Sequence, residues 1–107
     1  MSGHTELTSI EMVRDFINNH QKSFIYISSQ NCSVCHVVWP KVQDLLDEYP
    51  QIHVGKVDAD LVKQVAGEFL VFTVPAMLLL GNGKELIREN RFVRMEDLKN
   101  QLDQINQ

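Results

Sequence analysis

Residues 23–38 read SFIYISSQNCSVCHVV, and this stretch decides how the chain folds. Residues 23–28 are apolar at nearly every position and rich in β-branched and aromatic side chains, which is typical of a strand buried on both faces. From Ser33 the apolar residues take a helical spacing that continues to about Tyr49. The stretch therefore predicts a central buried strand that leads into a helix.

The two cysteines of the chain, Cys32 and Cys35, lie where this strand gives way to this helix. Two thiols three residues apart at the start of a helix can close a disulfide with little backbone movement. The first thiol also lies at the helix N-terminus, where unpaired N–H groups and the helix dipole favour an anion. Such a position lowers a thiol pKa from its free value of about 8.5 and favours the reactive thiolate. We therefore predict a dithiol/disulfide redox site.

The length, composition and net charge are those of an ordinary globular protein. Its 107 residues are 44% hydrophobic and 22% charged, with a net charge of −4, and they are enough to build one core in a single domain over residues 1–107. The negative charge and the lack of a basic patch argue against nucleic-acid binding. Because no apolar run approaches 18 residues and the N-terminus does not resemble a secretory signal, we expect no membrane partner and a cytoplasmic location. We also expect a monomer.

Hydrophobic spacing and turn residues divide the chain into alternating elements. Thr8 and Glu11 form a capping-box pattern at the start of a first helix, and residues 81–84 form a hairpin pattern. In chain order we expect a helix with an apolar stripe at Ile10, Val13, Phe16 and Ile17, strand 23–28, helix 33–49, strand 52–57, helix 61–69, strands 76–80 and 85–89, and helix 95–105. This order predicts an α/β fold with a central mixed four-stranded sheet flanked by helices on both faces.

The chain resembles the thioredoxin family over nearly its whole length. The residues that carry the resemblance are Cys32-Ser33-Val34-Cys35, Pro40 in the following helix, Lys56-Val57-Asp58, Thr73-Val74-Pro75 and Asn82-Gly83. A CxxC pair followed by this proline and, some forty residues on, by Thr-Val-Pro is far more specific than CxxC alone. The resemblance implies a thioredoxin-like fold and a cis peptide bond before Pro75.

The resemblance also implies an activity, that of a protein disulfide oxidoreductase working by thiol–disulfide exchange. Cys32 would attack the substrate disulfide, and Cys35 would resolve the mixed disulfide. The backbone of Val74, with Thr73 and Pro75 beside it, would bind an extended substrate segment. The implied partners are proteins that contain disulfides and an external reductant such as a thioredoxin reductase-type enzyme. We expect no cofactor and no metal.

Several positions depart from the family pattern. Tyr26 stands where a buried acidic residue usually lies, six residues before the first cysteine, and Lys56 matches the lysine that accompanies that acid. We therefore expect slower resolution by the second cysteine, with water or His36 as proton acceptor. Arg91 stands where the family commonly has a glycine on its substrate-facing surface. These departures indicate a protein with its own substrates rather than the general reductant.

Other interpretations of the cysteine pair fit the sequence less well. An inert buried pair is disfavoured by its place at a strand-to-helix junction. A zinc or iron–sulfur site needs more ligands than two cysteines and scattered histidines supply, although a cluster shared between two chains stays open. Cys32 to His36 also fit the pattern for covalent haem, which would require export. The alternative function is a non-catalytic interaction or redox-sensing module, and the presence of both cysteines favours the enzyme.

Overall fold

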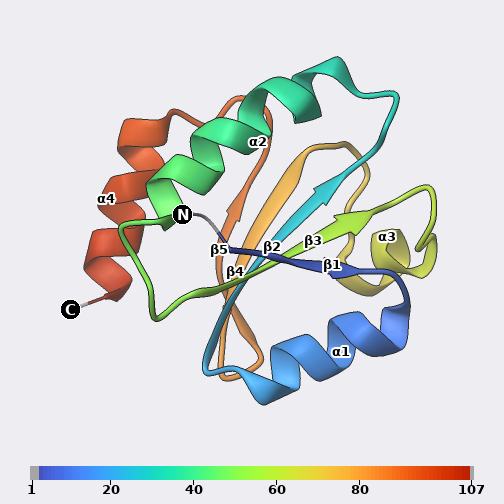
Figure 1. The fold of residues 1–107 in the computed structure, drawn as a ribbon, viewed down its shortest axis with the longest axis horizontal. Coiled ribbons are helices and arrows are strands. Elements are labelled where there is room, and N and C mark those ends of the chain that lie inside the picture. The colour runs from blue at the N-terminus through green and yellow to red at the C-terminus, as the bar shows by residue number, and fades with distance from the viewer. Residues whose placement is uncertain (1–2, 107) are drawn as a thin grey trace.

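The computed structural model describes residues 3–106. Over these residues the chain forms five strands and four helices (Figure 1). In chain order they are β1 (Thr5–Leu7), α1 (Ile10–Asn19), β2 (Lys22–Ser28), α2 (Ser33–Leu46), β3 (His53–Asp58), α3 (Gln64–Phe69), β4 (Ala76–Gly81), β5 (Lys84–Glu89) and α4 (Met95–Ile105). Every helix in this part of the chain falls short of the length and apolarity that crossing a membrane requires.

The strands form one mixed sheet in the order β1-β3-β2-β4-β5. β3 pairs in parallel with β1 and with β2, and β4 pairs antiparallel with β2 and β5. The mixed sheet with helices on both faces confirms the predicted α/β architecture. The predicted sheet lacked β1, because this strand has three residues and buries only Leu7, which is too little to produce an alternating pattern.

The central strand β2 separates two hydrophobic cores. Its side chains are buried from Ser23 to Ser28 and alternate between the two faces of the sheet. Ile25 and Ile27 pack in the core that α1 and α3 cover, whereas Phe24 and Tyr26 pack in the core that α2 and α4 cover. Figure 1 shows the same division of the helices between the two faces. The start of α2 is thus held against the most buried strand of the sheet.

The first helix has a different cap from the predicted one. Ser9 is the N-cap residue, and its Oγ accepts a hydrogen bond of 3.1 Å from the backbone N–H of Met12. Thr8 instead contacts the Met12 sulfur through its hydroxyl, so the predicted capping box is wrong by one residue. The buried stripe of α1 is as predicted: Ile10, Val13, Phe16 and Ile17.

The other boundaries lie close to the predicted ones, with two differences. α2 ends three residues before Tyr49, which follows in a turn and is buried in the core beneath α4. α3 covers only Gln64–Phe69, because residues 59–63 form turns. Pro40 lies inside α2, and α4 has the predicted bounds.

Candidate redox site

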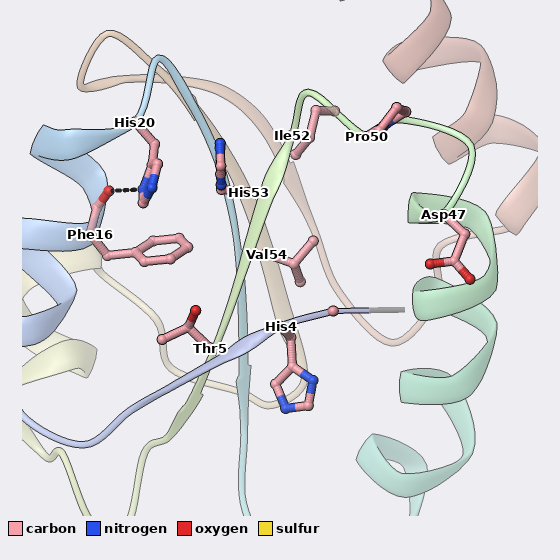
Figure 2. A pocket seen from close by; sticks show the side chains of 10 residues that line it. His4, Thr5, Phe16, His20, Asp47, Pro50, Ile52, His53 and Val54 are labelled. Carbon is pink, nitrogen blue, oxygen red and sulfur yellow. Dashed lines mark hydrogen bonds between the residues drawn. The ribbon is translucent and has the colours of Figure 1, made fainter. Parts of the chain in front are cut away.

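A pocket of about 520 Å³ lies between the end of α1 and the start of β3 (Figure 2). Among its lining residues, His20 and His53 stack with ring centroids 3.9 Å apart, and His20 Nδ1 lies 2.8 Å from the Phe16 carbonyl oxygen. Within residues 3–106, no group of three or more His, Cys, Asp or Glu side chains is placed to hold a metal ion, and these two rings do not belong to such a group. None of the predicted site residues lines this pocket.

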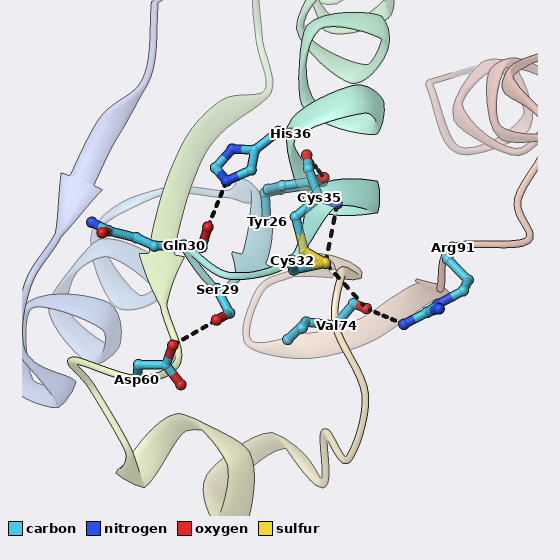
Figure 3. The surroundings of a disulfide bond; sticks show 9 residues. All are labelled: Tyr26, Ser29, Gln30, Cys32, Cys35, His36, Asp60, Val74 and Arg91. Carbon is cyan, nitrogen blue, oxygen red and sulfur yellow. Dashed lines mark hydrogen bonds between the residues drawn. A yellow bond between two sulfur atoms is a disulfide. The ribbon is translucent and has the colours of Figure 1, made fainter.

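The two cysteines form a disulfide at the start of α2, with their Cα atoms 5.3 Å apart (Figure 3). Cys32 is the N-cap residue, and its Sγ accepts a hydrogen bond of 3.1 Å from the backbone N–H of Cys35. Cys32 is partly exposed, whereas Cys35 is only 1% exposed. Cys32 is therefore the more accessible residue of the pair.

The N-cap position of Cys32 has an electrostatic consequence for the reduced protein. The first turn of a helix presents N–H groups that have no partner within the helix, and the helix dipole places partial positive charge there. Because the Cys35 N–H points at the Cys32 sulfur, it is placed to give a thiolate at that atom a charge-assisted hydrogen bond. We expect this arrangement to hold the pKa of reduced Cys32 below that of a free thiol.

The segment that precedes β4 lies against the disulfide. The Val74–Pro75 peptide bond is cis, Pro75 is buried and Thr73 is exposed. Cys32 Sγ lies 3.8 Å from the Val74 carbonyl oxygen. The structure thus brings the backbone of Val74 next to the sulfur of Cys32, the more accessible residue of the pair.

Arg91 reaches the site from the turn between β5 and α4. Its guanidinium Nη2 donates a hydrogen bond of 3.0 Å to the Val74 carbonyl oxygen, the same oxygen that lies beside Cys32 Sγ. Figure 3 shows Val74 between Cys32 and Arg91. The Arg91 side chain is therefore a neighbour of the disulfide through Val74, and its place on a substrate-facing surface stays a prediction.

Tyr26 lies on β2 beneath the first turn of α2. Its side chain is fully buried, and its hydroxyl donates a hydrogen bond of 2.7 Å to the Cys35 carbonyl oxygen. Burial raises the pKa of Tyr26, so the phenol stays protonated at neutral pH and acts as a donor rather than a base. Tyr26 therefore ties the helix start to the central strand.

The two other predicted supporting residues, Lys56 and His36, contact groups other than the two cysteines. Lys56 Nζ lies 5.4 Å from the centroid of the Trp39 ring, and this ring packs against Tyr26 with centroids 4.8 Å apart. His36 Nε2 lies 2.8 Å from the Gln30 carbonyl oxygen, and Figure 3 shows the ring directed toward that group. Lys56 thus adjoins the site through two aromatic rings, and the proton-acceptor role of His36 stays a prediction.

Sequence reasoning missed several side chains near the site. Ser29 Oγ donates a hydrogen bond of 2.5 Å to Asp60, which fastens the loop before the disulfide to the turn after β3. Phe72 and Phe92 are 86% and 82% exposed, and each adjoins a site residue in the chain. The signal that could have revealed them is an aromatic residue in a segment without helical or strand periodicity.

Comparisons with known proteins agree on one family. The family model described as Thioredoxin matches residues 5–104. The chain is 46% identical over 105 residues to the thioredoxin-like protein YdfQ of Bacillus subtilis (strain 168). The match covers 98% of this chain and 94% of that protein. It is 26% identical over 84 residues to a bifunctional thioredoxin reductase/thioredoxin of Mycobacterium leprae (strain TN), which covers 78% of this chain and 18% of that protein.

Solved structures agree on the fold. The structure of thioredoxin O2 from Arabidopsis thaliana in its oxidised state matches with a TM-score of 0.86 at 21% identity, over 99% of this chain and 96% of that one. At this identity the likeness shows a shared fold alone. With the family match over residues 5–104 and the disulfide at the start of α2, the conclusion is that this chain belongs to the thioredoxin family.

Proposed function

We propose that this protein reduces disulfides in other proteins through a reversible Cys32–Cys35 dithiol. Thioredoxins are thiol–disulfide oxidoreductases, and this family member keeps both cysteines. The observation that carries the proposal is the partly exposed residue Cys32 at the N-terminus of α2, whose sulfur accepts a hydrogen bond from the Cys35 N–H. A sulfur in this position favours its thiolate form, which is the nucleophile of thiol–disulfide exchange.

In the proposed reaction the Cys32 thiolate attacks one sulfur of a substrate disulfide. A bond forms between Cys32 Sγ and that sulfur, the substrate S–S bond breaks, and the other substrate sulfur leaves as a thiolate. Cys35 then loses its proton and attacks Cys32 Sγ, which breaks the mixed disulfide and releases the second substrate thiolate. Two electrons pass to the substrate, and the protein is left with the Cys32–Cys35 disulfide of the structure.

We infer that an extended substrate segment binds beside Val74. A segment whose backbone pairs with Val74 would bring its own disulfide to Cys32, because the Val74 carbonyl oxygen is 3.8 Å from Cys32 Sγ. Thr73 and Pro75 would flank the paired segment. Strand addition of this kind takes its affinity from main-chain hydrogen bonds, so side chains on the rim of the site are left to select among substrates.

The cycle requires an external reductant, for which we propose a thioredoxin reductase-type enzyme. The Mycobacterium leprae relative supports this choice, because its name joins a thioredoxin reductase and a thioredoxin in one protein. A cytoplasmic location and a monomeric state stay predictions, which cell fractionation and sedimentation would check.

Insulin reduction tests the proposed function. The protein, kept reduced by a small dithiol, should accelerate the precipitation of insulin chains, and Cys32→Ser should abolish the acceleration. Cys35→Ser should instead accumulate a mixed disulfide with the substrate, which mass spectrometry detects, because the resolving thiol is gone. Equal rates for the wild type and Cys32→Ser would overturn the proposal and favour a non-catalytic module.

A further inference from the structure

We propose that Arg91 is a specificity-determining residue that binds a carboxylate of the substrate beside the disulfide. The inference rests on the proposed function, since it names a substrate class for the same site. That class is extended peptide segments with an acidic side chain close to the cysteine that is attacked.

In the described part of the chain, one hydrogen bond to the backbone of Val74 sets the position of Arg91. Its Nη2 donates to the Val74 carbonyl oxygen at 3.0 Å, and that oxygen lies 3.8 Å from Cys32 Sγ. A guanidinium carries five N–H donors in one plane, so one neutral acceptor leaves donors for a second ligand. The carbonyl therefore holds the cation next to the reactive sulfur without neutralising its charge.

Within residues 3–106, no carboxylate lies at ion-pair distance from Arg91. Two of the other arginines do have such a partner, and Arg14 donates two hydrogen bonds to Glu68. Arg88 likewise donates two to Glu85. An exposed guanidinium binds a carboxylate through two parallel hydrogen bonds, a geometry that lysine does not offer. At the redox site, the carboxylate that completes this arrangement would come from the substrate.

The charged side chains on the two sides of the disulfide have opposite signs. Asp60, which accepts a hydrogen bond from Ser29, lies on the side of Cys32 opposite to Arg91 (Figure 3). An acidic side chain is repelled at the Asp60 side and attracted at the Arg91 side. Because the whole chain carries a net charge of −4, long-range attraction does not favour an acidic substrate, and the selection depends on the local contact.

Two matched peptides test the inference. Each contains one cysteine joined by a disulfide to a chromogenic thiol, and the residue next to the cysteine is Glu in one peptide and Gln in the other. The reduced protein is mixed with each peptide at low ionic strength, and the ratio of the two second-order rate constants, Glu over Gln, is measured. The same ratio for Arg91→Gln gives the intrinsic difference between the peptides. We expect the wild-type ratio to exceed it by roughly two- to fivefold, the range that exposed ion pairs give.

Arg94→Gln is the matched control, since it removes the same charge three residues away and Arg94 makes no hydrogen bond to Val74. It should keep the wild-type ratio, and 0.5 M salt should reduce the ratio in both proteins. Equal ratios for the wild type and Arg91→Gln, with both peptides reduced, would overturn this inference and leave the proposed function standing. An equal loss in Arg94→Gln would overturn it as well. Failure to reduce either peptide would overturn the proposed function and the inference with it.

Discussion

At the scale of single residues, the sulfur of Cys32 receives one backbone hydrogen bond and the field of a helix N-terminus. We predict that reduced Cys32 reacts with iodoacetamide with a pH midpoint clearly below the free-thiol value of about 8.5. Cys35→Ser isolates this thiol, so the measured rate belongs to one sulfur. The same variant unfolded in urea provides the reference, and an identical midpoint in the folded and unfolded chains would contradict the prediction.

Tyr26 provides a second prediction at this scale. Tyr26→Asp places a carboxylate beneath Cys35, where it can accept the proton of the resolving thiol, so release of the second substrate thiolate should become faster, by roughly 10²-fold for a well-placed acceptor. Rapid-quench analysis of the mixed disulfide measures that step. Tyr26→Phe is the control: it loses only the hydrogen bond to the Cys35 carbonyl, which should lower the free energy of unfolding by about 1 kcal/mol. A resolution rate in Tyr26→Asp that is unchanged or lower would count against the hypothesis.

At the scale of elements, the start of α1 depends on one side chain. Ser9 accepts the Met12 N–H, whereas Thr8 has no bond to a helix amide. Ser9→Ala should therefore lower the free energy of unfolding by about 1 kcal/mol, and Thr8→Ala should change it by much less. Urea denaturation measures both. The order of the two effects would be reversed if Thr8 were the cap, as the sequence pattern had indicated.

The free energy of unfolding should depend on pH through the contact between the end of α1 and the start of β3. Desolvation of the imidazole and the nearby His20 lower the pKa of His53, which is an exposed residue, and Asp47 is an acidic group that lines the same pocket. In the unfolded chain His53 takes up its proton near pH 6.5. The unfolded state therefore binds more protons as the pH falls through that value, and stability declines until the folded pKa is passed.

Urea midpoints between pH 8 and pH 5 measure this decline. His53→Gln should reduce the difference between the two ends of the range, and His20→Gln should move the NMR titration of His53 upward because a neighbouring positive charge is removed. A His53 titration that is the same in the folded and unfolded chains would contradict the assignment.

At the scale of the whole molecule, α1 and three strands meet at Gly55. A Cβ at this position would lie 2.6 Å from Leu7 Cδ1, 3.2 Å from Phe16 Cε2 and 3.3 Å from Ile25 Cδ1. Gly55→Ala should thus lower the free energy of unfolding by roughly 1–3 kcal/mol. Gly67→Ala is the matched control, since a Cβ there meets no atom within 4 Å and alanine favours the helix by about 0.5–1 kcal/mol. In thermal unfolding, Gly55→Ala should lower the melting temperature and Gly67→Ala should raise it.

Much of this architecture could be predicted from local pattern. The βαβ unit around the cysteines, the hairpin at Asn82 and Gly83, and the bounds of α4 follow from spacing and turn residues. β1 could not, because a strand of three residues exists through its pairing with the edge of β3, which is a tertiary contact. At the candidate site, the place of Cys32 at the start of a helix could be predicted from its place in the chain, whereas its proximity to Val74 came from the family resemblance alone.

The disulfide joins two residues within one turn of helix, so it constrains the unfolded chain little, and the bridge in denaturant behaves like that of a short peptide. A thermodynamic cycle then links denaturation to electron transfer. Urea denaturation gives the free energy of unfolding of the oxidised and of the reduced protein. The difference between the two, converted at about 30 mV for each 1.4 kcal/mol, is the difference between the reduction potential of the native protein and that of the peptide. If reduction adds stability through an anion at the cap, the native couple is the stronger oxidant of the two. Urea denaturation of the oxidised and of the reduced protein would therefore show whether the native pair or the peptide is the stronger oxidant.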